Sequence, residues 1–334
     1  MKYQALVLVI IILFSTFMLR SLSLQQRAIL PSSSIPESIT RLGTYEVPSL
    51  SQRNKFQAES LQELQNIASR RAASSSQTIT AVIEKPSVGR SIPLCAVQAA
   101  AFLVKDIIQG SNILSQNETG LRPIASVSKL MTTLIAVESL DPSTVVSITK
   151  EIHAQADGYA SLEVDASYTV QDLIRAALVV SSNDAAYALA TSFGYEAFIA
   201  RMNEKAKEIG MAQTIFSEPS GLSYLNQSTA TDLALLLEYI YRVHPELFAI
   251  TREKLVPIVN QTRQRTIQLS NVNYFAGTKD FIGGKTGFIN ESGGNLITLF
   301  NHVQSVWAVE VLGSNDRFGD VSKLLLCAQK MQKQ

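Results

Sequence analysis

The stretch RPIASVSKLMTTLIAVESL, residues 122–140, is an apolar segment with helical spacing that carries Lys129 three positions after Ser126. Residues three apart lie on the same face of a helix. A helix that begins at about Ala125 therefore brings the serine hydroxyl beside the lysine amine. The first turn of a helix also offers unpaired N–H groups and a partial positive charge. We therefore expect a buried helix that begins with two reactive side chains.

A serine hydroxyl is a weak nucleophile, and a lysine can act as its base only when the amine is neutral. Burial and nearby cations lower the pKa of lysine, and the flanking residues are apolar: Ile124, Val127, Leu130, Met131 and Leu134. The pair alone is a weak signal, because a helix-capping serine followed by a surface lysine gives the same pattern. A second copy, SITK at 147–150, is expected in a turn and a strand, where residues three apart face opposite sides.

Two further motifs strengthen the signal. VVSSNDAA at 179–186 contains Ser181 and Asn183 as S-x-N, and FIGGKTGFINESGG at 281–294 contains Lys285-Thr286-Gly287. Each has an ordinary structural explanation, a helix cap for the first and a β-turn for the second. Glycines around Lys285 are also expected to allow the backbone of a ligand to approach closely.

The ordered trio S-x-x-K, S-x-N, K-T-G is typical of β-lactamases and penicillin-binding proteins. The chain resembles the low-molecular-mass penicillin-binding proteins, which are serine D-alanyl-D-alanine carboxypeptidases of peptidase family S11 and related endopeptidases. Three phrases carry the resemblance, which covers about residues 95–330: RPIASVSKLMT at 122–132, EPSGLS at 218–223 and GGKTGF at 283–288.

The resemblance implies an α+β fold of the β-lactamase/transpeptidase-like type, in which a five-stranded antiparallel sheet is flanked by helices and a helical subdomain is inserted. The sequence pattern agrees with strands at both ends of the domain. A hairpin is expected from 96–106 and 111–117, and strands are expected at 295–300 and 305–313. Helical periodicity is found at 126–138, 170–180, 184–193, 195–209, 228–241 and 317–332.

The resemblance also implies the chemistry, which is hydrolysis of D-alanyl-D-alanine bonds in peptidoglycan stem peptides during cell-wall remodelling. The catalytic residues carried over are Ser126 as the nucleophile that forms an acyl-enzyme, Lys129 as its base, and Ser181 as the group that passes the proton to the leaving amine. β-Lactam antibiotics would act as covalent inhibitors. No cofactor and no metal are implied.

Substrate-binding roles are carried over in the same way. Lys285 would keep the local potential positive and help to hold Lys129 neutral. The backbone N–H groups of Ser126 and Phe288 would form the oxyanion hole. Asn183 is expected to bind a substrate amide. Thr286 and Gly287 are expected to lie on the strand that binds the terminal carboxylate, and Arg317 is expected to contact the same carboxylate. A solvent-exposed turn arginine is the alternative for Arg317.

The segment before the domain has two parts. Residues 5–19 form an apolar run, broken only by Ser15 and Thr16, between Lys2 and Arg20, which indicates an anchor or signal segment over 1–20. Because no small-x-small cleavage site follows, we expect an uncleaved membrane anchor, with a cleaved signal and secretion as the alternative. The Ser- and Gln-rich residues 21–92 are expected to be a linker, and 93–334 the catalytic domain outside the cytoplasm, in the periplasm or at the cell surface.

The composition excludes other classes of partner and site. A formal net charge of +1 and the absence of a long basic run give no reason to expect nucleic acid. The three histidines lie far apart, so no metal-ligand spacing is present. Cys95 and Cys327 form no CxxC motif. Two buried thiols are favoured for this pair over one disulfide.

Three alternative functions stay open from the sequence. A D,D-endopeptidase would cleave peptidoglycan cross-links with the same motifs. A class A-like β-lactamase would need a glutamate that activates the deacylating water, and Glu218 has a suitable position, but the expected E-x-x-L-N phrase is absent. A catalytically silent protein that binds the cell wall is the third alternative, and the intact trio argues against it.

Overall fold

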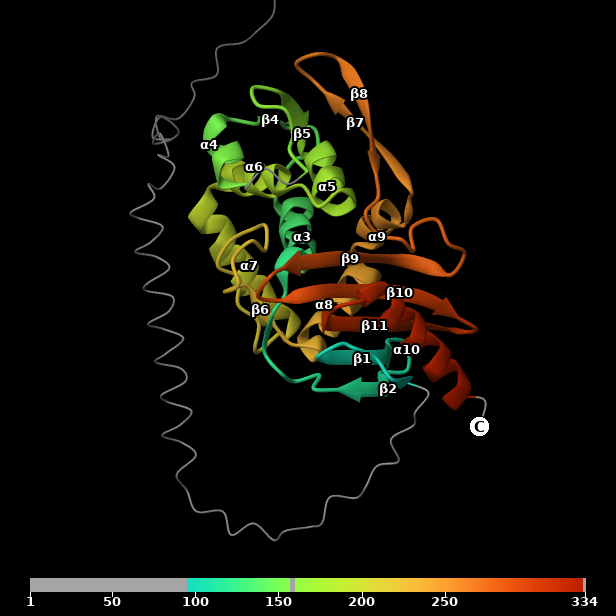
Figure 1. The fold of residues 1–334 in the computed structure, drawn as a ribbon. Helices are drawn as coiled ribbons and strands as arrows, with labels where there is room; N and C mark the ends of the chain where they lie inside the picture. Colours follow the sequence, from blue (N-terminus) through green and yellow to red (C-terminus); the bar gives the residue numbers. More distant parts are fainter. Residues whose placement is uncertain (1–94, 157–159, 333–334) are drawn as a thin grey trace, which may run out of the picture. The chain divides into compact units, whose positions relative to one another are not determined.

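The computed structural model describes residues 95–156 and 160–332, and its centre is a five-stranded antiparallel sheet (Figure 1). The strand order is β2-β1-β11-β10-β9. The expected α+β fold is confirmed, including the hairpin at the start and the pair of strands at the end. The strands of the sheet are β1 (Ala101–Asp106), β2 (Ser111–Gln116), β9 (Phe281–Ile289), β10 (Gly293–His302) and β11 (Ser305–Ser314).

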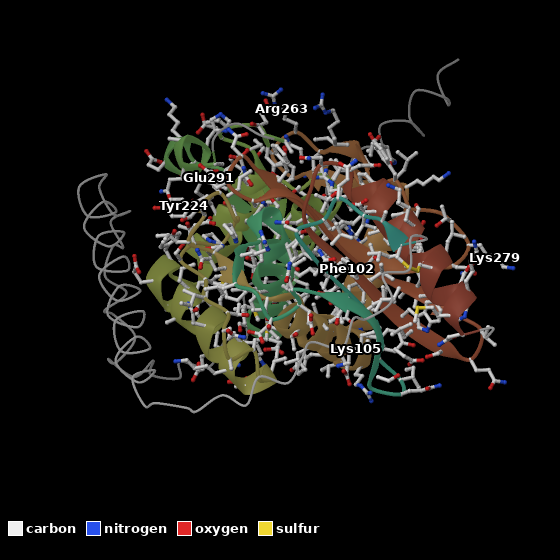
Figure 2. All side chains as sticks on the ribbon, turned by 60° about the horizontal axis from the view of Figure 1, so that its bottom comes forward. Phe102, Lys105, Tyr224, Arg263, Lys279 and Glu291 are labelled. Atoms are coloured by element: carbon white, nitrogen blue, oxygen red, sulfur yellow. A yellow bond between two sulfur atoms is a disulfide. The ribbon has the colours of Figure 1, made fainter. Side chains whose placement is uncertain are left out.

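Alternating side chains of the sheet belong to two separate cores. Ala101 and Leu103 of β1 face the core that includes the helical part, while Phe102 and Val104 face the core beneath the last helix. This alternation is the period of two that a sheet buried on both faces requires. The faces are covered by α8 (Ala230–Val243) and by α10 (Arg317–Met331) (Figure 1). Figure 2 shows Phe102 within the sheet, whereas Arg263 and Lys279 project from the outside of the molecule.

The segment between β2 and β9 forms the inserted helical part, and the helix carrying Lys129 is its buried centre. Residues 129–136 of this helix, α3, are all buried. Side chains of Thr169, Ser182 and Thr229 cap the helices that follow them. The helices are η3 (Ala125–Ser128, 3-10), α3 (Lys129–Ser139), α4 (Lys150–Gln155), α5 (Val170–Val179), α6 (Asn183–Phe193), α7 (Tyr195–Ile209) and α9 (Pro245–Arg252).

Three short two-stranded sheets complete the inserted part. β4 pairs with β5, β3 pairs with β6, and β7 pairs with β8, all antiparallel. The strands of these small sheets are β3 (Arg122–Pro123), β4 (Val145–Ser147), β5 (Ser167–Thr169), β6 (Gln227–Ser228), β7 (Leu255–Asn260) and β8 (Arg265–Ser270).

The second SxxK copy is divided between two elements, because Ser147 is the last residue of β4 and Lys150 is the first residue of α4.

Cys95 and Cys327 are joined by a disulfide, with Cα atoms 5.7 Å apart. The expectation of two free thiols was therefore wrong. The sequence alone could not show that α10 returns along the sheet to the point where the chain enters β1. The bond closes a very long loop, and such cross-links restrict the unfolded chain most.

The predicted anchor and linker, residues 1–20 and 21–92, lie outside the described residues, so the predicted division of the chain stays a prediction. Within residues 95–156 and 160–332, no helix is long and apolar enough to cross a membrane.

Candidate active site

Ser126 and Lys129 meet as the spacing predicts. The Lys129 Nζ lies 3.0 Å from the Ser126 Oγ. The local geometry is tighter than expected, because Ser126 lies in the 3-10 turn η3 and the α-helix begins only at Lys129. Ala125 has a positive φ of 50°, which is an uncommon backbone conformation for a residue with a side chain. The turn thereby leaves Ser126 partly exposed while Lys129 is fully buried.

The amine of Lys129 has two further partners. It lies 2.7 Å from the Asn183 Oδ1 and 2.7 Å from the carbonyl oxygen of Ser220. Burial lowers the pKa of Lys129 to about 7, although the negative charge of Glu218 opposes this shift. A substantial fraction of the amine is therefore neutral near pH 7.

A neutral Lys129 has a defined hydrogen-bonding pattern. The neutral amine has two N–H groups and one lone pair. The Asn183 Oδ1 and the Ser220 carbonyl oxygen can only accept, so they receive both N–H bonds. The lone pair then faces the Ser126 hydroxyl, which donates to it. This arrangement prepares the hydroxyl to lose its proton to Lys129.

Lys285 and Ser181 form a second pair. The Lys285 Nζ donates to the Ser181 Oγ at 2.9 Å and to the Thr286 carbonyl oxygen at 2.8 Å. Ser181 joins α5 to α6 with a φ of 61°. Burial lowers the pKa of Lys285 well below its usual value, and the positive charges of Lys129 and Arg317 add to this effect. The charged forms of Lys129 and Lys285 repel each other, so the site disfavours two charged lysines at once.

Asn183 is fixed by contacts within the protein. Besides accepting from Lys129, its amide donates through Nδ2 to the carbonyl oxygen of Ala156 at 2.9 Å, and the residue is buried. Asn183 therefore positions Lys129. Its expected contact with a substrate amide stays a prediction.

β9 carries the K-T-G motif at the open edge of the sheet. The Gly284 N–H points away from β10, because it donates to the Thr251 Oγ1 at 3.1 Å. The register from Gly283 to Ile289 is regular, and alternate residues of a strand direct their N–H groups to the same side. The N–H groups of Thr286 and Phe288 therefore also face outward, as an oxyanion hole at Phe288 requires.

Arg317, at the start of α10, also reaches this edge. Its Nη1 donates to the Gly287 carbonyl oxygen at 3.0 Å, and its guanidinium lies over the Phe318 ring, 5.3 Å from the centroid. Arg317 therefore belongs to the site's surroundings and is not a solvent-exposed turn residue. Its contact with a substrate carboxylate stays a prediction.

The glycines of β9 allow close approach of the protein's own elements. A Cβ at Gly287 would lie 2.7 Å from the Ile124 carbonyl oxygen, and one at Gly283 would lie 2.6 Å from the Phe248 Cβ. Gly287 therefore lets β9 pack directly against the turn that contains Ser126. We had expected these glycines to make room for a ligand, and the described contacts show room for neighbouring backbone and side chains.

A loop from the phrase EPSGLS completes the site, although only its Glu218 was weighed from the sequence. The Glu218 carboxylate accepts from the Ser220 N–H and hydroxyl at 2.7 and 2.6 Å, and from the Gly221 N–H. This turn directs the Ser220 carbonyl oxygen at Lys129. A carboxylate used by its own loop is poorly placed to activate a water, which argues against the β-lactamase alternative.

Among the residues that the structure describes, no group of three or more His, Cys, Asp or Glu side chains could hold a metal ion. The described geometry of Ser126 and Lys129 provides for nucleophilic attack by a serine beside a buried amine.

Residues 87–315 match the family model for D-alanyl-D-alanine carboxypeptidase, peptidase family S11. This chain belongs to that family. It is accordingly a serine-type D-Ala-D-Ala peptidase of the penicillin-binding protein group, and the predicted enzyme class is confirmed.

Individual relatives agree with the family. The chain is 31% identical over 238 residues to the D-alanyl-D-alanine endopeptidase of Escherichia coli K12, an alignment that covers 68% of this chain and 76% of that protein. It is 30% identical to the carboxypeptidase DacB2 of Mycobacterium tuberculosis, covering 60% and 69%. The crystal structure of penicillin-binding protein D2 from Listeria monocytogenes with ampicillin bound matches with a TM-score of 0.60 and 28% identity, covering 70% and 98%.

Gly221 provides a test of how tightly the site is packed. It has a φ of 82°, and a Cβ there would overlap the carbonyl group of Ala125. Gly110 has a similar φ of 74° with no atom within 4 Å of its Cβ position. Gly110→Ala should lower the free energy of unfolding by only about 1–2 kcal/mol, because of backbone strain. Gly221→Ala should lower it by about 1–3 kcal/mol more, because of overpacking, and should also displace Ser126.

Urea unfolding and the rate of labelling by a fluorescent penicillin measure the two effects. Equal stabilities and equal labelling rates for the two variants would contradict the described packing of the loop against η3.

Proposed function

We propose that the protein hydrolyses D-alanyl-D-alanine bonds of peptidoglycan stem peptides through an acyl-enzyme on Ser126. The single observation that carries this proposal is the buried Lys129 amine, whose Nζ lies 3.0 Å from the Ser126 Oγ and 2.7 Å from two fixed acceptors, the Asn183 Oδ1 and the Ser220 carbonyl oxygen. Family membership supplies the substrate class.

Acylation begins when the Ser126 Oγ attacks the carbonyl carbon of the scissile bond and its proton moves to Lys129. The negative charge on the carbonyl oxygen is stabilised by the outward N–H of Phe288 together with the N–H of Ser126. The C–N bond then breaks, and the leaving amine takes a proton through Ser181, whose hydroxyl is polarised by Lys285 at 2.9 Å. Water hydrolyses the ester with Lys129 again accepting the proton.

The substrate lies along the edge of β9 in this mechanism. Phe288 binds the carbonyl oxygen of the acyl side, and Thr286 binds the terminal carboxylate of the leaving side, with Arg317 adding positive charge. β-Lactams, which combine a reactive carbonyl with a carboxylate, fit the same positions. The likeness to a relative whose crystal structure contains ampicillin supports this assignment.

A D,D-endopeptidase is the second candidate function, and one observation favours it. The relatives from E. coli and Pseudomonas aeruginosa that match over 76% and 82% of their own length are both endopeptidases. Such an enzyme uses the same nucleophile but accepts a longer leaving group. Both activities break the same kind of bond.

We further propose that residues 5–19 anchor the protein in a membrane and that the catalytic domain lies outside the cytoplasm. The length of the apolar run and the charged residues on either side support the anchor. The disulfide between Cys95 and Cys327 supports an oxidising compartment. Secretion after cleavage is the alternative outcome.

The catalytic pair can be tested with an internal control. Ser126→Ala and Lys129→Ala should each reduce release of D-alanine and acylation by penicillin at least about 10³-fold, because nucleophile and base act as a unit. Ser147→Ala and Lys150→Ala change the exposed second copy of the motif and should leave both activities intact. Product analysis with defined monomeric and cross-linked muropeptides separates carboxypeptidase from endopeptidase.

A fully active Lys129→Ala enzyme would contradict the assignment of the base. A folded wild-type protein that is never acylated would favour the silent wall-binding alternative. Rapid and sustained penicillin hydrolysis would favour the β-lactamase.

The pH dependence of acylation follows from the pKa of Lys129, which burial lowers to about 7. Only the neutral amine accepts a proton. The acylation rate should therefore rise with pH, fall about tenfold per pH unit below roughly pH 6, and level off above roughly pH 8. Stopped-flow measurement of penicillin acylation across this range checks it. An acylation rate that is constant from pH 5 to 9 would be incompatible with a lysine base of this pKa.

The anchor can be tested by deleting residues 1–20. Full-length protein should sediment with membranes and require detergent for release, because residues 5–19, apolar apart from Ser15 and Thr16, contribute substantial transfer free energy. The deletion variant should not reach the extracytoplasmic side, and protease added outside intact cells should not degrade it. Recovery of a soluble extracellular product that begins near residue 20 would establish secretion instead.

A further inference from the structure

The loop over residues 271–280 joins β8 to β9 and begins beside the active site. The Val272 N–H donates to the carbonyl oxygen of Val179 at 3.1 Å. Val179 is the last residue of α5, and Ser181 follows it by two positions. Val179 also belongs to the core that includes the helical part. The start of the loop therefore lies near Ser181, on the face of the sheet that carries the catalytic lysines.

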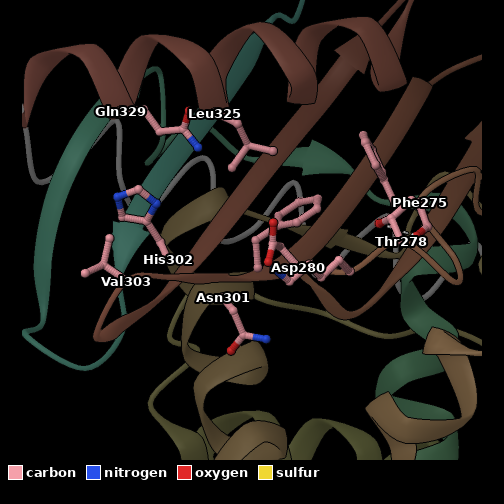
Figure 3. Close-up of a pocket in the computed structure, with 10 residues that line it drawn as sticks. Phe275, Thr278, Asp280, Asn301, His302, Val303, Leu325 and Gln329 are labelled. Atoms are coloured by element: carbon pink, nitrogen blue, oxygen red, sulfur yellow. Dashed lines mark hydrogen bonds between the residues drawn. The ribbon is translucent and has the colours of Figure 1, made fainter.

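The same loop then reaches the opposite face of the sheet. The Tyr274 ring stacks on the Phe318 ring with centroids 4.4 Å apart, and Phe318 directly follows Arg317 in α10. Phe275 lines a cavity of about 380 Å³ that α10 also lines (Figure 3). Asn273 is therefore the residue at which the loop passes from one face to the other, around the open edge of β9.

Contacts with α9 fix the point on β9 at which the loop passes. The Asn273 N–H donates to the Asn271 Oδ1 at 2.9 Å, and the Asn271 Nδ2 donates to the carbonyl oxygen of Thr251 at 2.8 Å. The Thr251 Oγ1 in turn accepts from the Gly284 N–H. The loop therefore passes β9 close to Gly284. Thr286 follows by two residues, roughly 7 Å of strand, and belongs to the leaving side in the proposed mechanism.

The side-chain amide of Asn273 has a donor that the protein does not use. The residue is only 4% exposed. Its Oδ1 accepts from the Phe275 N–H at 3.1 Å, which fixes the orientation of the amide. Its Nδ2 is buried and has no hydrogen-bond partner within residues 95–156 and 160–332. A buried donor without a partner is costly, and an acceptor on the substrate would satisfy it.

The substrate supplies such an acceptor at this point. In the proposed mechanism the terminal carboxylate of the leaving residue lies at Thr286, and its two oxygens can accept about four hydrogen bonds. Burial lowers the pKa of Lys285, and the charges of Lys129 and Arg317 lower it further. A further cation would add to this repulsion, whereas the amide of Asn273 can donate to the carboxylate without adding charge.

We propose that the Asn273 Nδ2 binds the α-carboxylate of the leaving residue and thereby selects substrates in which this carboxylate is free. The proposal rests on the peptidase function proposed above. Asn273 shares the carboxylate with Thr286 and Arg317, and the loop from Asn271 to Phe275 forms the wall of the site on the leaving side.

The experiment compares two stem peptides that end in D-Ala-D-Ala, one with a free terminal carboxylate and one with a terminal carboxamide, as substrates of the full-length protein. Asn273→Asp keeps the acceptor for the Phe275 N–H and replaces the donor with a negative charge. The ratio of kcat/KM for the acid to kcat/KM for the amide should fall about 10-fold or more, through KM, because a hydrogen bond to a charged group contributes about this factor. Hydrolysis of the carboxamide should be largely retained, because a carboxylate at position 273 can accept from it.

Matched variants show whether the loop or the donor is responsible. Asn273→Ser keeps a side-chain acceptor for the turn but is too short to replace the Nδ2, so the ratio should fall here too. Asn112→Asp places the same negative charge at an exposed position of β2, at the opposite edge of the sheet, and should leave the ratio unchanged. Thermal unfolding identifies the variants that are folded. An unchanged ratio in a folded Asn273 variant, or an equal fall in Asn112→Asp, would overturn the proposal.

A binding measurement separates this proposal from the proposed function. Calorimetry with the full-length Ser126→Ala protein gives the ratio of affinities for the acid and the carboxamide peptide without any turnover. A ratio that falls about 10-fold when Asn273→Asp is added supports the role of Asn273 even if the wild-type protein hydrolyses neither peptide. An unchanged ratio, or no binding of the acid, rejects this role even if D-alanine is released.

Discussion

The buried amine of Lys129 is the constraint on which the rest of the structure depends. An amine without water must find partners for all its hydrogen-bonding capacity, because an unpaired buried polar group costs several kcal/mol. Its three partners come from segments far apart in the chain: η3, the start of α6 and the loop after α7. Each of these segments must therefore hold its position within a few tenths of an ångström.

The second lysine extends the same constraint to the sheet. Lys285 is buried against Ser181 and close enough to Lys129 for the two charges to repel. Glu218 acts in the opposite direction and favours the charged form of Lys129. The balance of burial against the negative charge of Glu218 leaves the Lys129 pKa at about 7, which suits a catalytic base near neutral pH. Gly287 makes this possible by letting β9 lie against η3.

The sequence predicted the elements better than their local geometry. Alternating and helical patterns located the strands at both ends, α5 and α7 within a residue or two, and the spacing of Ser126 and Lys129 predicted their contact. It could not show the positive φ of Ser181, the extra residue of β9 between Phe281 and Gly283, or the disulfide. Those features result from long-range packing, which overrides local preference, and no pattern of period two or 3.6 encodes them.

The features that the sequence could not show are concentrated where the structure is least favourable by itself. Two buried amines and two residues with side chains at positive φ, Ala125 and Ser181, are expected to destabilise the native state. They persist because the surrounding structure holds them in place. One hydrophobic core lies on each face of the sheet, and a disulfide joins Cys327 in α10 to Cys95 before β1. The rest of the protein must therefore offset the destabilisation that the site causes. The sheet, buried on both faces, therefore carries the lysine that must stay at a fixed distance from Ser181.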